Sequence, residues 1–137
     1  MTESIELGPG REFDIIRELL ARWGPRALGI GDDAAMLEVP AGEQLVVSAD
    51  NSVEHIHFER AWLTAREIGY RATMAALSDL AAMAAAPLGV LLSIGLPKSW
   101  LDAVGELGDG VGEAIDRAYT LVRGGDITGA SDLTLAL

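Results

Sequence analysis

The sequence predicts an α/β (α+β) domain in which a mixed sheet is flanked by helices. Two stretches, 12–23 and 64–84, repeat apolar residues at three- and four-residue spacing, as amphipathic helices do. Short runs rich in valine, leucine and isoleucine lie between and after them, as strands do. The chain has 137 residues, half of them hydrophobic, which is enough to bury one core, so we expect a single domain over 1–137.

The first half of the chain is expected to hold one helix and two paired strands. The helix covers Glu12–Trp23 and ends at a Gly-Pro pair. Strands at 35–39 and 44–48 form a hairpin, joined by the Pro-Ala-Gly-Glu turn at 40–43. The stretch 53–58 carries both histidines at alternate positions and is expected to be extended.

The second half is expected to begin with the longest helix. Thr64 is its N-cap, Glu67 is its capping-box partner, and the helix runs to about residue 84. The elements expected after it are a fully buried strand at 88–96, a helix from 99 or 100 to about 119, a short strand at 120–122 and a strand from 133. Glycines weaken the middle of the last helix, and we interpret the run 108–112 as an irregularity in it.

The charge of the chain excludes several classes of function. The formal net charge is −11, which opposes sequence-independent nucleic-acid binding and docking on anionic membranes. No apolar run reaches the length of a transmembrane helix, so no membrane partner is expected. The chain has no cysteine, which excludes disulfides and thiolate nucleophiles and fits a cytoplasmic location.

An acidic pair follows a Gly-Ile-Gly turn, and three later aspartates resemble its companions. The pair is Asp32 and Asp33, and the companions are Asp50, Asp79 and Asp126. Adjacent carboxylates repel each other unless cations neutralise them, and Mg²⁺ binds carboxylates together with substrate phosphates. Glycines before Asp33 and Asp126 allow positive φ and close approach of the backbone to a ligand. We therefore expect these aspartates to converge on divalent cations that hold the phosphates of a nucleotide.

Each aspartate also has a simpler interpretation. The acidic pair can be a solvated turn, Asp50 an N-cap or Asx-turn, and Asp126 part of an ordinary turn. Asp79 lies in an otherwise apolar stretch, where a buried carboxylate needs a partner or a metal, although it can also lie on an exposed helix face.

The two histidines offer different chemistry. His55 and His57 point to the same side of an extended segment, but without cysteine or a third nitrogen ligand a zinc site is not expected. His55 is best read as a hydrogen-bonded side chain at a strand edge, and His57 as the better candidate for a polar substrate contact. The chain contains neither a P-loop nor a dinucleotide-binding glycine motif.

Six stretches in order resemble one family. They are GREFDII at 10–16, LGIGDDAA at 28–35, VSAD at 47–50, VEHIHF at 53–58, LSDLAAM at 77–83 and GGDIT at 124–128. The chain resembles the N-terminal domain of thiamine-monophosphate kinase. That family shares a superfamily with aminoimidazole ribonucleotide synthetase, selenophosphate synthetase and a hydrogenase maturation factor.

The resemblance implies an ATP-dependent kinase that converts thiamine monophosphate to the diphosphate with Mg²⁺. It also implies a homodimer in which the two sheets form a barrel with ATP near the interface, and a second domain absent from this chain. The metal ligands that it implies are Asp33, Ser48, Asp50, Asp79 and Asp126, with Asp32 close by. It assigns Gly125 and Asp126 to ATP and His57 to the substrate.

The chain departs from the family pattern at three positions. Ala49 stands where a threonine is usual, Ile56 replaces a small residue, and no glycine follows Met83. The first two departures bear on metal or substrate binding, and we attribute the third to packing. Two other functions stay open: a non-catalytic dimerisation or ligand-binding module with a degenerate metal site, and another ATP-dependent synthetase of the same superfamily.

Overall fold

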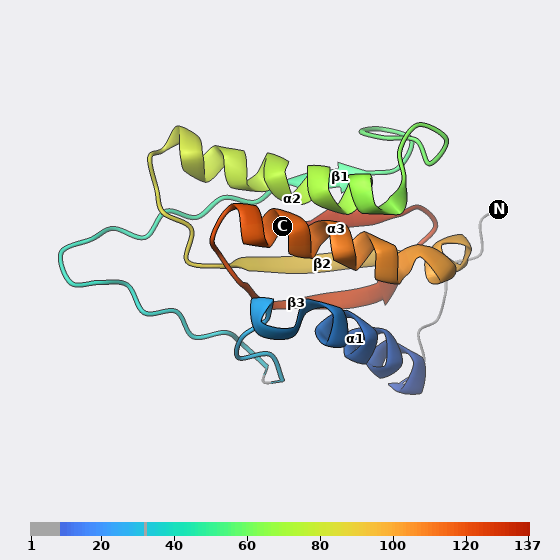
Figure 1. Ribbon diagram of the computed structural model, residues 1–137, viewed down its shortest axis with the longest axis horizontal. Helices are drawn as coiled ribbons and strands as arrows, with labels where there is room; N and C mark the ends of the chain where they lie inside the picture. Colours follow the sequence, from blue (N-terminus) through green and yellow to red (C-terminus); the bar gives the residue numbers. More distant parts are fainter. Residues whose placement is uncertain (1–8, 32) are drawn as a thin grey trace.

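The computed structural model describes residues 9–31 and 33–137, and these residues form three α-helices and a four-stranded sheet (Figure 1). The helices are α1 (Pro9–Trp23), α2 (Ala65–Ala82) and α3 (Val104–Arg117), and the strands are β1 (Asn51–Val53), β2 (Val90–Leu96), β3 (Val122–Gly129) and β4 (Thr134–Ala136). Short 3-10 helices cover Gly24–Arg26 and Lys98–Ala103. The predicted α/β class is confirmed.

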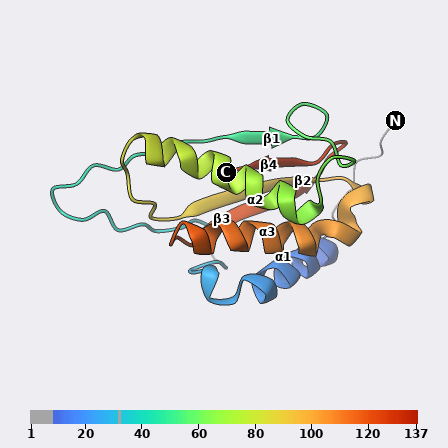
Figure 2. The same ribbon diagram turned by 45° about the horizontal axis from the view of Figure 1, so that its top comes forward.

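The sheet is mixed, with strand order β1-β4-β2-β3. β2 and β3 are parallel, and β4 runs antiparallel to both β1 and β2. All three helices lie on the same side of the sheet (Figures 1 and 2). One row of paired residues crosses the sheet through Asn51, Ala136, Ser93 and Asp126, so β1 and β3 form its two edges.

The core lies between the sheet and the helices. Burial alternates along β2, where Leu92, Ile94 and Leu96 are buried. Leu91 is 56% exposed and Ser93 is also exposed, so the prediction of a fully buried strand is wrong. The physical reason is that helices cover one face of the sheet only, and alternate side chains of a strand point to opposite faces.

The glycines of α3 let it approach α2 closely. A Cβ atom on Gly110 would lie 1.9 Å from the carbonyl oxygen of Arg66, and one on Gly69 would lie 2.1 Å from that of Leu107. The interpretation of the glycine run as a helix irregularity is therefore wrong, because these residues lie in a regular helix. Their missing side chains allow backbone to pack against backbone.

Both ends of α2 have a recognisable cap. At the start, Thr64 and Glu67 form the predicted capping box. At the end, the Ala85 N–H donates to Leu80 O (2.9 Å) and the Ala84 N–H donates to Ala81 O (3.0 Å). This is a Schellman motif, and its C′ residue, Ala84, has φ of 54°. The departure after Met83, which we attributed to packing, therefore concerns a backbone conformation that favours glycine.

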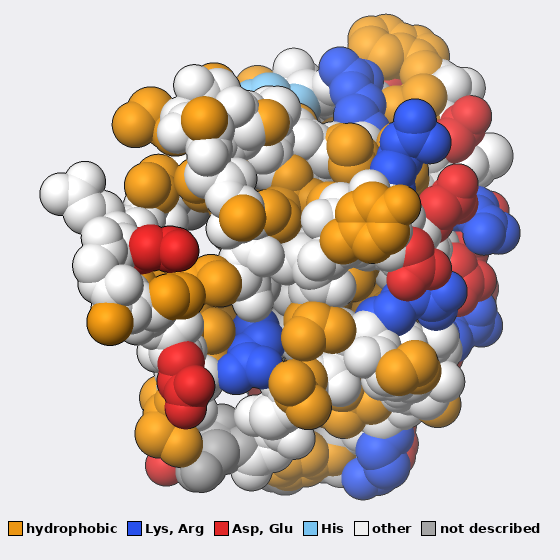
Figure 3. All heavy atoms as spheres, turned by 60° about the vertical axis from the view of Figure 1, so that its left-hand side comes forward, with side chains coloured by type: hydrophobic (Ala, Val, Ile, Leu, Met, Phe, Trp, Pro, Cys, Tyr) orange, Lys and Arg blue, Asp and Glu red, His pale blue; other side chains and the backbone are white. Residues whose placement is uncertain are grey.

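The predicted hairpin at 35–39 and 44–48 is wrong. Residues 33–49, called the arm below, contain no strand and extend away from the body (Figure 1). The turn at 40–43 is present, with the Glu43 N–H donating to Pro40 O (3.1 Å). Met36 is 87% exposed and Val47 is 79% exposed, so within this chain the arm has no sheet to pack on. Figure 3 faces this end of the molecule and shows hydrophobic side chains exposed on the arm and on the body.

Two further predictions need correction. Val53 is the last residue of β1, and the stretch 54–58 is a tight turn rather than extended, because the His55 N–H donates to Phe58 O (2.8 Å) and the His57 N–H donates to Val53 O (2.8 Å). The strand predicted at 120–122 instead begins at Val122 and continues to Gly129. The helix predicted at 12–23 is confirmed, although it begins at Pro9. No described helix is long and apolar enough to cross a membrane.

Candidate functional site

Two of the predicted metal ligands meet where the arm returns to the body. Ser48 lies near the end of the arm, and Asp79 lies in the last turn of α2. The Ser48 hydroxyl donates to Asp79 Oδ2 at 3.0 Å, across a sequence separation of 31 residues. Of the two positions that the sequence left open for Asp79, buried or on an exposed helix face, the structure shows the exposed one. Its carboxylate nevertheless takes part in a long-range contact.

Asp50 lies two residues after Ser48 in the sequence and directly precedes β1. Its N–H donates to Leu137 O (2.8 Å), and the Leu137 N–H donates to Asp50 O (3.0 Å), which extends the β1–β4 ladder. Its Oδ1 accepts from the Asn51 N–H at 2.9 Å. A carboxylate has about four acceptor positions, so this local bond leaves capacity for a cation.

Asp126 occupies the opposite edge of the sheet. It lies within β3, is exposed, and pairs with Ser93 of β2. In the row of paired residues that crosses the sheet, Asp126 lies three strand spacings from Asn51, or roughly 14 Å. Because Asp50 is next to Asn51, Asp50 and Asp126 of one chain do not meet. A Cβ atom on Gly125 would lie 1.8 Å from Leu92 O, so the contact between neighbouring strands already requires glycine there.

The glycine turn before the acidic pair begins beside β3. The Leu28 N–H donates to Val122 O at 3.0 Å, and the chain then turns through Gly29 and Gly31. Their φ values are 72° and 134°, which confirms the predicted use of glycine for positive φ. Asp33 is exposed after this turn, and the prediction for Asp32 lies outside the described residues.

The turn at residues 54–58, called the histidine turn below, also contains Glu54, to which the sequence assigned no role. Glu54 is buried, and its Oε2 accepts from Trp100 Nε1 (2.9 Å) and from the Leu133 N–H (3.0 Å). His55 contacts Glu59, with Nδ1 to Oε2 at 2.8 Å. This hydrogen bond is the main cause that raises the pKa of His55, and the charges of Glu59, Glu54 and Asp132 act in the same direction.

Within the described part of the chain, one group of three His, Cys, Asp or Glu side chains has ligand atoms within 4.8 Å of one another: Glu54, His55 and Asp132. None of the predicted aspartates belongs to it. Glu54 Oε2 already accepts two hydrogen bonds, so the group is better explained as a structural anchor. No signal in the sequence pointed to this role, because Glu54 stands among other polar and charged residues and its partner Trp100 lies 46 residues away.

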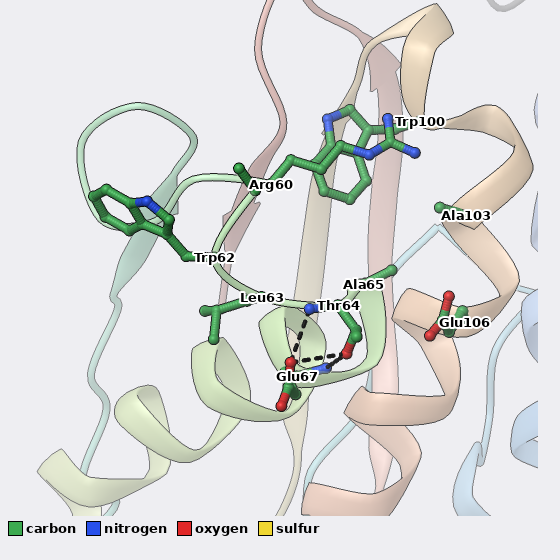
Figure 4. Close-up of a pocket in the computed structure, with 10 residues that line it drawn as sticks. Arg60, Trp62, Leu63, Thr64, Ala65, Glu67, Trp100, Ala103 and Glu106 are labelled. Atoms are coloured by element: carbon green, nitrogen blue, oxygen red, sulfur yellow. Dashed lines mark hydrogen bonds between the residues drawn. The ribbon is translucent and has the colours of Figure 1, made fainter.

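A hollow lies elsewhere, at the start of α2 (Figure 4). Its volume is about 390 Å³. It lies far from Asp79, because Thr64, which lines it, is separated from Asp79 by roughly 22 Å along α2. Several polar groups that line it already have partners: Thr64 and Glu67 bind each other, and the Arg60 guanidinium lies 4.2 Å from the centre of the Trp100 ring. A second cavity, of about 70 Å³, lies between α1 and β3 near Asp126 and is too small for a nucleotide.

The family of the chain follows from a match over most of its length. The family model described as AIR synthase related protein, N-terminal domain, matches residues 31–137. The chain belongs to this family. The matched range thus begins at the last residue of the glycine turn, Gly31, and includes the arm, the whole sheet, α2 and α3.

Individual relatives and solved structures give more specific similarities. A thiamine-monophosphate kinase of Synechococcus elongatus is 44% identical over 111 residues, which cover 78% of this chain and 33% of that protein. The structure of thiamine-monophosphate kinase from Stenotrophomonas maltophilia K279a matches with a TM-score of 0.74 and 36% identity, over 99% of this chain and 43% of that one. A structure described as AaThiL complexed with AMPPCP and TMP matches with a TM-score of 0.67 and 25% identity, over 95% of this chain and 40% of that one. The chain therefore spans less than half the length of these relatives.

Proposed function

We propose that this chain is the nucleotide- and magnesium-binding N-terminal domain of a thiamine-monophosphate kinase, which converts ATP and thiamine monophosphate to ADP and thiamine diphosphate. The contact between Ser48 and Asp79 carries the proposal, because it joins two distant stretches of the family pattern at 3.0 Å. The similarity to a thiamine-monophosphate kinase at 44% identity supports this member of the family over a synthetase.

The donor set fits magnesium. The proposed ligands are Asp33, Ser48, Asp50, Asp79 and Asp126, with Asp32 nearby, and all offer hard oxygen atoms. When bound, Mg²⁺ neutralises phosphate charge, which together with positioning accounts for most of the catalysis of phosphoryl transfer. The hydrogen bond between Ser48 and Asp79 supports the proposal for these two residues, because it brings their oxygen atoms within 3.0 Å of each other. Ala49 offers no side-chain oxygen, so this chain has one ligand fewer than the usual threonine would provide.

The placement of the other ligands supports a homodimer. Asp50 and Asp126 lie at opposite edges of the sheet, roughly 14 Å apart, which is too far for a single ion to bind both in one chain. The face of the sheet away from the helices carries the exposed Leu91 and Ser93. We propose that this face pairs with that of a second copy to form a barrel, and that β1 of one copy then approaches β3 of the other.

The remaining assignments concern ATP and the substrate. We propose that Gly125 and Asp126 contact ATP, since AMPPCP, an ATP analogue, is named in the AaThiL complex together with TMP. His57 is exposed on the turn after β1 and is the proposed contact for thiamine monophosphate. The 390 Å³ hollow is not part of this proposal, because it lies at the far end of α2.

Calorimetry with Mg²⁺ and AMPPCP tests the proposal. We expect binding that requires Mg²⁺ and that weakens about tenfold or more in Asp79→Asn, since the loss of a ligand should cost at least as much as the loss of an outer-shell partner. Asp102→Asn is the matched control, because Asp102 is an exposed aspartate outside the proposed ligand set.

The outcome also separates the alternatives. A dimer, verified by ultracentrifugation, that binds no nucleotide with or without Mg²⁺ would refute the nucleotide-binding role and favour a dimerisation module. Nucleotide binding without turnover of thiamine monophosphate, by a longer gene product that carries this chain, would refute the kinase assignment and favour a synthetase.

A further inference from the structure

The turn after β1 holds the ring of His57 against its own backbone. The Val53 N–H donates to His57 Nδ1 at 3.0 Å, and the His57 N–H donates back to Val53 O at 2.8 Å. Because Nδ1 accepts a hydrogen bond from a backbone donor, the proton of the neutral imidazole lies on Nε2. His57 is exposed, so its free Nε2–H is a donor available to a ligand.

Glu54 anchors the start of this turn. Its side chain is 9% exposed, and Oε2 accepts from Trp100 Nε1 (2.9 Å) and from the Leu133 N–H (3.0 Å). Its own N–H donates to Leu133 O at 2.9 Å. The carboxylate thus connects the turn to the 3-10 helix before α3 and to the residue before β4, and a buried carboxylate is stable only with such partners.

Trp100 anchors the other end of the turn as well. Phe58 closes the turn and is 2% exposed, and its ring meets the Trp100 ring edge-on at 6.5 Å between centres. Trp100 is 1% exposed, and the Arg60 guanidinium covers its ring. Both ends of the turn therefore rest on one indole, through a hydrogen bond at Glu54 and ring packing at Phe58.

We propose that Glu54 is a positioning residue for His57: through Trp100 and Leu133 it holds the turn in the shape that keeps the His57 proton on Nε2, aimed at an anionic oxygen of the substrate. The position of the carboxylate sets the path of residues 53 and 54, and the Val53 N–H selects the tautomer of the ring. The identity of the substrate oxygen, a phosphate oxygen of thiamine monophosphate, rests on the proposed function.

The tautomer of His57 can be read directly by long-range ¹H–¹⁵N spectra of the ¹⁵N-labelled chain at about pH 8, where an ordinary imidazole is neutral. The chain has two histidines, so a His55→Asn variant assigns both rings. We expect the native His57 ring to show one bare nitrogen, Nδ1, and one protonated nitrogen, Nε2. In Glu54→Leu we expect the two nitrogen shifts of His57 to move toward each other, as the tautomers mix.

Two further variants keep the test decisive. Glu54→Gln retains an oxygen that can accept both hydrogen bonds, so it should preserve the native His57 pattern. Trp100→Phe removes the indole N–H but retains an aromatic ring. In this variant, too, the two nitrogen shifts of His57 should move toward each other, so the test remains available if Glu54→Leu does not fold. A folded Glu54→Leu or Trp100→Phe protein with the native His57 pattern would overturn the positioning role, because a merely structural carboxylate leaves the tautomer unchanged.

Titration with thiamine monophosphate then separates this inference from the proposed function. We expect the Nε2 signal of His57 to shift with thiamine monophosphate and the shift to be lost in Glu54→Leu but retained in Glu54→Gln. If His57 keeps its native tautomer but its Nε2 signal does not shift with thiamine monophosphate, the substrate contact is overturned. If the chain shows no Mg²⁺-dependent binding of AMPPCP, the proposed function is overturned, and the result on the tautomer stands.

Discussion

The C-terminal cap of α2 predicts that one glycine will stabilise this protein. Ala84 occupies the C′ position of a Schellman motif with φ of 54°, a conformation in which Cβ crowds the following carbonyl oxygen. Glycine has no Cβ and is the usual residue at such a cap. The substitution Ala84→Gly should therefore keep both hydrogen bonds of the motif and remove the crowding.

The expected gain follows from two opposing terms. An L-residue in the left-handed region costs about 1–2 kcal/mol, which glycine avoids. Glycine in turn loses about 0.5–1 kcal/mol more conformational entropy on folding than alanine. The net expectation for Ala84→Gly is about 0.5–1 kcal/mol of added stability, or an increase in Tm of roughly 2–5 °C for a chain of this size.

Urea denaturation followed by circular dichroism measures this change. The matched control is Ala86→Gly, two residues later, at an exposed position that is not among the residues with positive φ. There the same substitution has only the entropic cost, so stability should fall by about 0.4–1 kcal/mol. The two variants should thus differ in sign. Equal effects of Ala84→Gly and Ala86→Gly, or a loss of stability in Ala84→Gly, would refute the reasoning.

Two further predictions concern the helix interface and the histidine turn. Gly110→Ala should lower the free energy of unfolding by about 2 kcal/mol despite the better helix propensity of alanine, because the new Cβ meets Arg66 O at 1.9 Å. In the control Gly112→Ala the new Cβ meets only side chains, the nearest at 3.3 Å. In the same denaturation assay this control should change the free energy of unfolding by less than about 1 kcal/mol. The pKa of His55 is raised, first by its hydrogen bond with Glu59 and then by the charges of Glu59, Glu54 and Asp132. Protonation of His55 therefore stabilises the fold. This contribution is complete below the unfolded value of about 6.5 and is lost as pH rises through the folded pKa, so the Tm difference between the native chain and His55→Asn should shrink from about pH 6 to pH 8. A Tm difference independent of pH would contradict the assignment.

Local patterns were sufficient to locate the helices. The capping box of Thr64 and Glu67 marks the start of α2, and the Gly-Pro pair marks the end of α1. These signals act over three or four residues and need no partner elsewhere in the chain. The end of α2 was displaced by two residues, since alanine at C′ gives no warning of a left-handed cap.

Strands were harder to predict because their stability comes from partners. The stretch 44–48 has the composition of a strand but remains without a ladder, whereas β3 continues through Gly124 and Gly125, which resemble a turn. In β3 the neighbouring strand β2 supplies the hydrogen bonds that the local sequence does not favour. In the arm no such neighbour exists within the described chain.

The candidate site divides in the same way. The sequence by itself determined the chemistry: oxygen donors after flexible turns, a negative chain with no cysteine, and an ordered set of motifs whose similarity to thiamine-monophosphate kinases is confirmed. Only the tertiary structure decided which donors meet, since hydrogen bonds across the fold join Ser48 to Asp79 and Glu54 to Trp100, while the strand order sends Asp50 and Asp126 to opposite edges. The physical reason is that residue type fixes what a side chain can bind, whereas distance depends on how strands far apart in the sequence pair.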